Sequence, residues 1–287
     1  MKVAMIGLRG MGDGLGGVEK AVRETATRMV ENGHDVTCYC KSAYSTDNDY
    51  KGVKLINIKT QKGKHLETLI YSIKAILHAC RQDYDIIHIH ALASACLAWI
   101  PKFIYKKHVI ISVHGLDWQR EKWGFIARQV LKFGEWASVK FANSTLCVSK
   151  SLCMYYKMKY NQDNIKYIPN GCDIDDEQYQ ALPEYKKSSY FLYLGRLVPE
   201  KGVHNLIEAY KGLTTNKKLI ITGPESDRTY FQQLKKAAEG HKNIIFTGAM
   251  YDQQKVRLLA NAYMFVLPSA IEGLPIALLE AASYGVC

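Results

Sequence analysis

The sequence predicts an α/β protein with two Rossmann-like domains, each built on a parallel β-sheet. Short apolar strand candidates alternate with amphipathic helical segments along most of the chain, which is the pattern of parallel sheets. The alternation pauses in a polar, turn-rich stretch and restarts at residue 190. A length of 287 residues agrees with two domains at roughly 150 residues each. We therefore expect domains over 1–170 and 190–287, joined by a linker over 171–189.

The individual elements follow the same pattern in chain order. The first strand is "KVAMIG", and the helix after it starts near Gly17 with apolar residues at helical spacing and stops at Gly33. The other strand candidates of the first domain are "DVTCYC", "VKLINIK", "IIHIH", "HVIISVHG", "STLCVS" and "IKYIPN". Those of the second domain are "YFLYLG", "KKLIITG", "NIIFTG" and "YMFVLPS". Ligands of such sheets lie beyond the carboxyl ends of the strands, so the residues after each strand carry the functional information.

Composition and charge narrow the class of protein. The amino terminus lacks the apolar region and cleavage site of a signal peptide, and no apolar run reaches the ~18 residues of a membrane span. The eight cysteines lack a paired C-x-x-C spacing, so we expect reduced thiols and a cytoplasmic protein. A net charge of +11 favours an anionic partner. Nucleic acid, an anionic membrane surface and a phosphorylated ligand all fit it, as does a surface with dispersed solvated charges, and the charge alone does not choose between them. No nucleic-acid-binding module is recognisable, so nucleic acid is not expected as a partner.

Two familiar motifs occur here without their usual context. In "GMGDGLGG", Gly12, Gly14 and Gly17 match the dinucleotide pattern G-x-G-x-x-G. Four residues separate the strand, which ends at Gly7, from Gly12, and no acidic residue follows the second strand. A nicotinamide cofactor is therefore not expected. Gly16 and Gly17 nevertheless precede a helix, where backbone N–H groups could approach a phosphate or a sugar, or simply form a turn.

Three D-x-D pairs, at 47/49, 83/85 and 173/175, lie in polar loops, in the linker or before a strand, so we expect no metal site.

The most informative constellation lies in the second domain. Arg196 and Lys201 in "YLGRLVPEKG" follow a strand and precede a helix, a placement suited to a diphosphate, although a solvated loop would look similar. In "EGLPIALLE", Glu272 lies in a loop and Glu280 lies in the next helix. Glu272 and the amides of Gly273 and Leu274 could face a sugar, while Glu280 could accept hydrogen bonds from ribose hydroxyls.

Five motifs together resemble the retaining glycosyltransferases of family 4, which have the GT-B fold: "GLGGVEKAV", "SVHGLDW", "IPNGCD", "YLGRLVPEKG" and "EGLPIALLEAASYG". The resemblance implies that Arg196 and Lys201 hold the donor diphosphate and that Glu280 binds its ribose. Glu272, Gly273 and Leu274 would face the transferred sugar, and Gly16 and Gly17 would approach the donor. The donor that the resemblance implies is a nucleoside-diphosphate sugar used as substrate, and neither a cofactor nor a metal is expected.

The loop after "HVIISV" supplies the residues of the first domain. His114 in "SVHG" matches the active-site histidine of the family, with a satisfied buried histidine as the alternative. "HGLDWQREKWG" resembles bacterial rhamnosyltransferases of capsule and cell-wall polysaccharide synthesis. Asp117, Trp118 and Arg120 would then shape the acceptor side, although Trp118 could equally pack a helix. For His88 and His90 in "IIHIH", core packing and acceptor contact both stay open.

The acceptor implied by the resemblance is a saccharide or a polyprenyl-linked saccharide, which would place the enzyme on the inner face of the cell membrane. Two basic stretches could contact anionic lipid there, "WIPKFIYKK" and "KTQKGKH", the latter with Lys59, Lys62, Lys64 and His65. A solvated helix end is the alternative for both.

Proteins of this fold continue beyond "LLEAASYG", so the resemblance implies a second domain that is incomplete at its C-terminus. An exposed sheet edge would then favour self-association or marginal stability. Two other functions stay open at this point. One is a non-catalytic, truncated nucleotide-sugar-binding or scaffold protein, and the other is a different GT-B enzyme such as a sugar-nucleotide epimerase.

Overall fold

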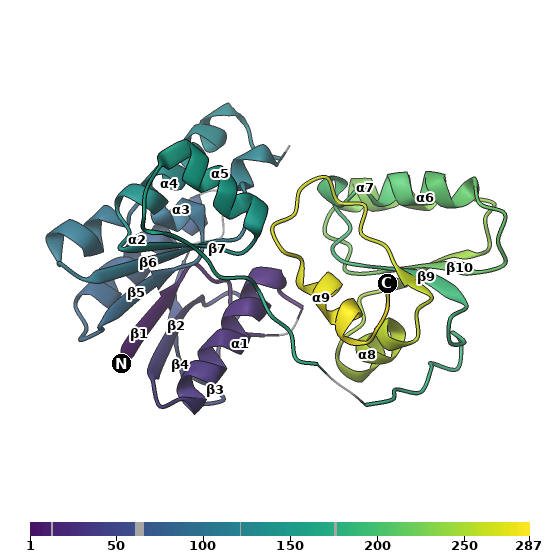
Figure 1. The fold of residues 1–287 in the computed structure, drawn as a ribbon, viewed down its shortest axis with the longest axis horizontal. Coiled ribbons are helices and arrows are strands. Elements are labelled where there is room, and N and C mark those ends of the chain that lie inside the picture. The colour runs from purple at the N-terminus through teal and green to yellow at the C-terminus, as the bar shows by residue number, and fades with distance from the viewer. Residues whose placement is uncertain (13, 61–65, 121, 175–176) are drawn as a thin grey trace. The chain divides into compact units, whose positions relative to one another are not determined.

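The computed structural model describes residues 1–12, 14–60, 66–120, 122–174 and 177–287. The chain forms two compact units, Met1–Asn170 and Gly171–Cys287 (Figure 1). Each unit is a sheet with helices on both faces, as expected for strands that are buried on both sides.

The sheet of the first unit has the strand order β3-β4-β2-β1-β5-β6-β7-β8. All neighbouring strands run parallel except β3 and β4. The strands are β1 (Lys2–Ile6), β2 (Asp35–Lys41), β3 (Asp49–Tyr50), β4 (Val53–Ile58), β5 (Ile86–Ile89), β6 (His108–Val113), β7 (Ser144–Cys147) and β8 (Ile165–Tyr167).

Strand β3 is a departure from the predicted parallel pattern. Tyr50 pairs with Val53, and the two residues between them, Lys51 and Gly52, both have positive φ, at 50° and 80°. Two such residues form the tight turn that joins antiparallel strands. Asp49, which the sequence placed in a polar loop, therefore starts an edge strand.

Helices cover both faces of this sheet. Helix α1 (Gly17–Glu31) packs through Val22 and Ala26 on one face. Helix α2 (Leu66–Cys80), the short α3 (Leu92–Ala95) and the π-helical turn η1 (Ile100–Ile104) pack on the other. The unit also contains the 3-10 turn η2 (Asp117–Gln119), α4 (Phe125–Lys140) and α5 (Lys150–Tyr160). Helix α4 lies tightly against α3, because a Cβ atom on Gly134 would come 2.1 Å from the Leu92 carbonyl oxygen.

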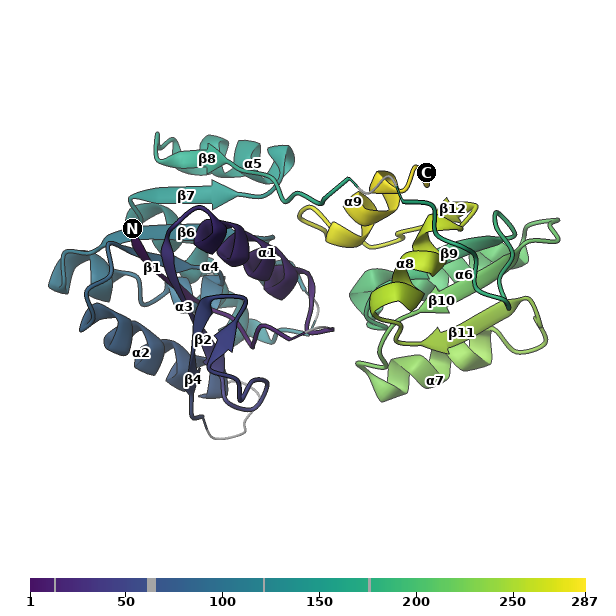
Figure 2. The ribbon, with the colours of Figure 1, turned by 90° about the horizontal axis from the view of Figure 1, so that it is seen from below.

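The second unit has the strand order β11-β10-β9-β12, all parallel. Helices α6 and α7 share one core with the sheet, and α8 and α9 share another (Figure 2). The elements are β9 (Tyr190–Leu194), η3 (Pro199–Lys201), α6 (Val203–Lys211), β10 (Lys218–Thr222), α7 (Arg228–Ala237), β11 (Ile244–Gly248), α8 (Asp252–Ala260), β12 (Met264–Phe265) and α9 (Ile276–Ser283).

Part of the segment expected as a linker packs on the second unit. Arg257 Nε donates a hydrogen bond to the Gln180 carbonyl oxygen at 2.7 Å, and Asn261 Nδ2 donates to that of Tyr179 at 2.9 Å. Leu182 and Tyr185 pack against the core that β9 shares with α8. Residues 179–185 are therefore part of this unit's structure.

Candidate active site

The first group of predicted residues lies where β1 leads into α1. Gly16 precedes the helix with φ at 149°, and Gly17 is its first residue. Arg9 and Glu19 form a two-point ion pair beside Gly16, with Nε–Oε1 at 2.7 Å and Nη2–Oε2 at 3.2 Å. A Cβ atom on Gly16 would lie 2.9 Å from both side chains, whereas a Cβ atom on Gly17 would meet open space. The ion pair therefore requires glycine at 16 and leaves the backbone at 17 accessible.

Sequence reasoning missed the Arg9–Glu19 pair. The available signal was an arginine just after the first strand and a glutamate in the first turn of the next helix. Glu19 is buried, and because buried carboxylates almost always have a partner, its pairing with Arg9 is the expected arrangement.

Three histidines stack at the carboxyl ends of β5 and β6. The ring centroids of His88 and His90 are 3.9 Å apart, and those of His90 and His114 are 5.8 Å apart. His88 Nε2 shares a hydrogen bond of 2.8 Å with Ser112 Oγ. Both ring nitrogens of His90 and Nε2 of His114 are buried without a hydrogen-bond partner among the described residues. His114 therefore belongs to a cluster of three histidines. The sequence did not predict this cluster.

The histidine cluster is neutral at pH 7. Burial lowers the pKa of His114 to about 4. Burial and the neighbouring His114 together lower the pKa of His88 to about 3, and burial lowers the pKa of His90 well below its ordinary value. A neutral imidazole has one N–H donor and one nitrogen acceptor. Each unpartnered nitrogen is thus a donor or an acceptor according to the tautomer.

The predicted acceptor-side residues lie together in η2 and directly after it. Asp117 Oδ1 pairs with Arg120 Nη2 at 3.1 Å. The indole Nε1 of Trp118 donates to Glu135 Oε2 of α4 at 2.5 Å. Trp118 therefore anchors the loop to α4 while part of its side chain stays exposed.

Glu135 is fully buried and organises this region. Its carboxylate accepts hydrogen bonds from one residue of η2 and three of α5. The donors are Trp118 Nε1, Tyr155 OH at 3.1 Å, Lys159 Nζ at 2.7 Å and Tyr160 OH at 2.6 Å. Sequence reasoning did not single out Glu135, although it is the one acidic residue in α4.

In the second unit, the loops after β9 and β10 meet at two glycines. A Cβ atom on Gly223 would lie 1.8 Å from the Gly195 carbonyl oxygen. The Gly195 N–H donates to the Thr222 carbonyl oxygen at 3.0 Å, and the Leu197 N–H donates to that of Pro224 at 3.2 Å. Arg196 lies between these two anchored positions. The loop backbone that carries Arg196 is thus held against the neighbouring strand end, with Gly223 as a requirement that sequence reasoning missed.

The structure brings Lys201 and Glu272 together across 71 residues of sequence. Lys201 Nζ forms an ion pair with Glu272 Oε1, and both side chains are largely shielded from solvent. Two backbone contacts hold their loops in place. The Ala270 N–H donates to the Glu200 carbonyl oxygen at 3.2 Å. Gly202, with φ at 66°, lies so close to Pro268 that a Cβ atom would come 2.3 Å from its carbonyl oxygen.

The remaining donor-side residues lie at α9. Gly273 and Leu274 are in the loop before the helix, and Glu280 is in its second turn. Lys255 Nζ of α8 donates to Glu280 Oε1 at 2.6 Å. Lys255 was not singled out from the sequence, because no local pattern links it to a residue 25 positions later.

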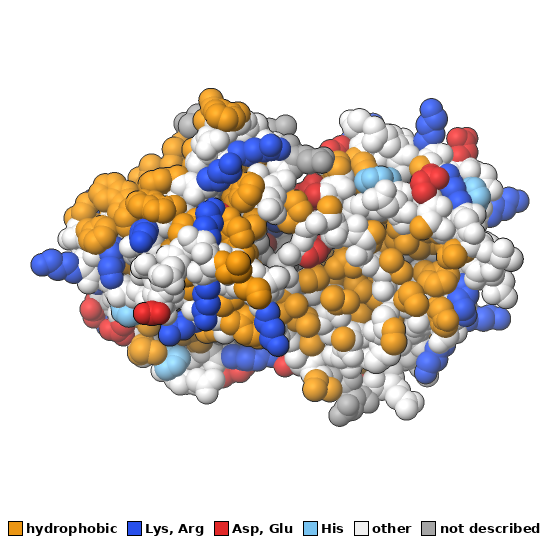
Figure 3. Space-filling view, turned by 45° about the horizontal axis from the view of Figure 1, so that its top comes forward, with side chains coloured by type: hydrophobic (Ala, Val, Ile, Leu, Met, Phe, Trp, Pro, Cys, Tyr) orange, Lys and Arg blue, Asp and Glu red, His pale blue; other side chains and the backbone are white. Residues whose placement is uncertain are grey.

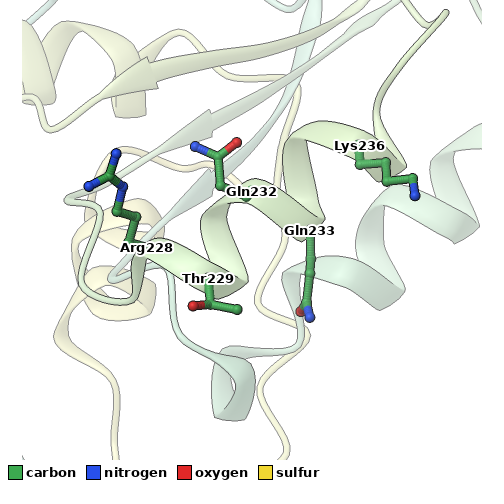
Figure 4. Close-up of a pocket in the computed structure, with 5 residues that line it drawn as sticks. All are labelled: Arg228, Thr229, Gln232, Gln233 and Lys236. Carbon is green, nitrogen blue, oxygen red and sulfur yellow. The ribbon is translucent and has the colours of Figure 1, made fainter.

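Among the described residues, helix α7 by itself lines a surface hollow. The hollow has a volume of about 480 Å³, and Arg228 and Gln232 point to one side while Thr229 and Gln233 point to another (Figure 4). Over the described ranges, no cluster of His, Cys, Asp or Glu side chains is arranged to hold a metal ion. Likewise, none of the helices described has both the length and the apolar character of a membrane span. Lys62, Lys64, His65 and Asp175 lie outside the described residues.

Solved structures share this fold. The structure of Anabaena HepE in complex with UDP and glucose matches all of this chain and 79% of its own, with a TM-score of 0.78 at 19% identity. This likeness confirms the predicted fold class, the two Rossmann-like units of GT-B glycosyltransferases.

Proteins with similar sequences are also glycosyltransferases. The UDP-Gal:alpha-D-GlcNAc-diphosphoundecaprenol alpha-1,3-galactosyltransferase of Escherichia coli is 25% identical over 95% of this chain and 75% of its own length. The D-rhamnosyltransferase WbpZ of Pseudomonas aeruginosa is 37% identical over 45% of this chain and 35% of its own.

Family models cover nearly the whole chain. Residues 174–287 match the model of glycosyl transferases group 1. Residues 15–176 match the model of Glycosyltransferase Family 4. The chain therefore belongs to Glycosyltransferase Family 4.

Proposed function

We propose that this protein is a retaining, metal-independent glycosyltransferase. It transfers a hexose or a deoxyhexose such as rhamnose from a nucleoside-diphosphate sugar to a saccharide or polyprenyl-linked saccharide in surface polysaccharide synthesis. The observation that carries the proposal is the Lys201–Glu272 ion pair in the loops beyond β9 and β12. It joins a cation suited to a phosphate with a carboxylate suited to sugar hydroxyls.

The donor diphosphate binds Arg196 and Lys201. Lys201 is paired with Glu272 without ligand, so an incoming phosphate oxygen competes with the carboxylate for the ammonium group. Displacement frees Glu272 to accept hydrogen bonds from hydroxyls of the transferred sugar, beside the Gly273 and Leu274 amides. Charge exchange of this kind couples the arrival of the diphosphate to the positioning of the sugar.

Glu280 binds the ribose, and its partner Lys255 holds the carboxylate in place. Gly16 and Gly17 contribute backbone amides at the positive end of the α1 dipole. In the first unit, neutral His114 offers one donor and one acceptor to a sugar hydroxyl. Its neutrality at pH 7 follows from burial.

The reaction needs no protein nucleophile. The acceptor hydroxyl attacks the anomeric carbon on the face from which the nucleoside diphosphate departs, and the leaving phosphate oxygen takes the hydroxyl proton. Negative charge develops on the β-phosphate as the glycosidic bond breaks. Arg196 and Lys201 stabilise that charge, and such preorganised electrostatic stabilisation is often the largest catalytic contribution.

The names of relatives support the substrate classes. The name of the E. coli relative specifies a UDP-galactose donor and a diphosphoundecaprenol-linked acceptor. The name of WbpZ specifies a D-rhamnosyltransferase. We infer a donor of this type and an acceptor held by Asp117, Trp118 and Arg120. A polyprenyl-linked acceptor places the reaction at the cytoplasmic face of the cell membrane.

Calorimetric titration with UDP, dTDP and GDP tests the donor site. We expect one nucleotide to bind, and Arg196→Ala and Glu280→Ala each to weaken it about tenfold or more, since a hydrogen bond to a charged group contributes about 1.5–3 kcal/mol. Arg228→Ala in α7, another arginine of the same unit, is the matched control. Failure of all three nucleotides to bind, or equal loss in the control, would contradict the proposed site. Anomeric configuration of the product by NMR, with and without EDTA, then tests retention and metal independence.

A further inference from the structure

We propose that the first unit docks on anionic lipid bilayers through an apolar face formed by α4 and η1. This α4–η1 face consists of Phe103, Ile104, Ile126, Val130, Phe133 and Trp136. Figure 3 shows hydrophobic side chains gathered on the first unit, at the left, with lysine and arginine side chains among them. The inference rests on the proposed function in one respect: a lipid-linked acceptor would bring the protein to a membrane.

The residues of the α4–η1 face are large, apolar and exposed to solvent. Ile126 is 79% exposed, and Phe103 and Ile104 are each 59% exposed. Aromatic contacts through Phe141 make the face continuous, because Phe141 lies 5.7 Å from Phe103 and 5.1 Å from Trp136 between ring centroids. Clustered exposed apolar side chains, unlike scattered ones, mark interaction surfaces.

The fold does not account for this face. Helix α4 already buries its opposite side, where Leu131, Gly134 and Glu135 pack inward. The exposed residues recur at Ile126, Val130, Phe133 and Trp136, a spacing that places them along one stripe of the helix. Burial of the inner side stabilises the unit, so the outer stripe is left for an external partner.

The charges beside the face identify that partner as an anionic surface. Lys102 lies within η1, Lys106 lies just after it, and Lys140 lies at the end of α4. The one acidic residue of α4, Glu135, is fully buried and already accepts four hydrogen bonds. Apolar and aromatic side chains flanked by lysines form the pattern of a helix that lies in the bilayer interface, with lysines reaching phosphate headgroups.

The position of the face in the chain connects it to the acceptor side. Residues 114–120 follow β6 and carry His114, Asp117 and Trp118, and α4 begins at Phe125. Trp118 is fastened to α4 by its hydrogen bond to Glu135. A helix that lies on the membrane would thus hold the acceptor-side loop near the lipid-linked end of an acceptor.

Vesicle binding by the full chain tests the inference. Flotation with vesicles of equal parts phosphatidylglycerol and phosphatidylethanolamine, and with phosphatidylcholine vesicles, separates anionic from neutral surfaces. The variant Ile126→Ser/Phe133→Ser should lose about tenfold or more in vesicle affinity, because each large apolar side chain contributes substantially when it leaves water. The matched control is Met154→Ser/Met158→Ser, which removes two exposed apolar side chains from α5. We expect the control to bind like the wild type.

A charge variant tests the lipid specificity. Lys102→Glu/Lys140→Glu should weaken binding to the anionic vesicles about tenfold, and added salt should weaken wild-type binding. The tryptophan emission of the wild type, which includes that of Trp136 on the face, should shift to shorter wavelength on binding. Absence of wild-type binding, equal loss in the Met154/Met158 control, or a dimer in sedimentation that the face variant breaks would overturn the proposal. Nucleotide titration is independent of vesicles, so failure of docking and failure of the donor site are distinguishable.

Discussion

Replacing Glu135 with glutamine should strongly destabilise the first unit. The substitution keeps the shape of the side chain and removes its charge, while the four donors around it stay in place. Tyr155, Lys159 and Tyr160 all donate to Oε1, and Trp118 donates to Oε2. A glutamine that keeps its oxygen at the Oε1 position turns its NH₂ group towards the indole N–H, so two donors face each other.

The magnitude follows from these contacts. An unsatisfied buried donor costs about 1–3 kcal/mol, and hydrogen bonds to a charged group contribute about 1.5–3 kcal/mol each. The Lys159 side chain is 43% exposed, so solvent screens its part of the interaction. We therefore expect a loss of about 3–5 kcal/mol in the free energy of unfolding, the range for breaking a buried charged pair. For a unit of this size, that loss lowers Tm by about 6–20 °C.

Urea denaturation followed by tryptophan emission measures the effect. All four tryptophans, at positions 99, 118, 123 and 136, lie in the first unit, so their emission reports its unfolding without a contribution from the second. Tyr160→Phe is the graded control, since it removes one donor and leaves the carboxylate paired. It should cost about 1.5–3 kcal/mol, the contribution of a single hydrogen bond to a charged group.

The reasoning would be refuted by a Glu135→Gln variant that loses less than about 1 kcal/mol with an unchanged dependence on urea. In that case the four hydrogen bonds would contribute no more than water does in the unfolded chain. A change in the urea dependence alone would instead indicate an altered native or denatured state.

Two further predictions concern the histidine cluster and the glycine beside Lys201. Acidification from pH 7 to pH 5 should destabilise the first unit by up to about 2 kcal/mol for each of His88 and His114, because their lowered pKa values leave the folded state unprotonated while the unfolded state binds protons. This stability is complete above pH 6.5 and is lost as the pH falls towards about 4 for His114 and about 3 for His88. Urea midpoints that stay constant between pH 7 and pH 5 would contradict it. Gly202→Ala should lower the thermal stability of the second unit and weaken nucleotide binding, because its Cβ atom would press on the Pro268 carbonyl oxygen at 2.3 Å in a left-handed backbone conformation. Calorimetric titration and a thermal scan check this, and binding at wild-type strength would show that the loop tolerates the shift.

The sequence by itself determined the parallel α/β architecture of both units, except for the antiparallel edge strand β3. Continuous apolar runs such as those of β1 and β10 predict strands buried on both faces, and helical spacing from Gly17 predicts α1. These signals are local, because strand and helix periodicities repeat within a few residues. The sequence also indicated candidate site residues that follow strands whose carboxyl ends meet at one edge of each sheet, but not Glu135 or Lys255.

The tertiary structure decided which of those residues meet and how they are charged. Lys201 reaches Glu272 and Lys255 reaches Glu280 only because separate loops and helices converge on one sheet. The neutral state of the stacked histidines and the four hydrogen bonds that Glu135 accepts both depend on burial. The spacing of residues in the sequence does not show which side chains will be buried. The exposure of the apolar stripe of α4 is likewise decided by the tertiary structure. Periodicity shows that a helix has an apolar side, but only packing against neighbouring elements determines which side is buried and which is left for a partner.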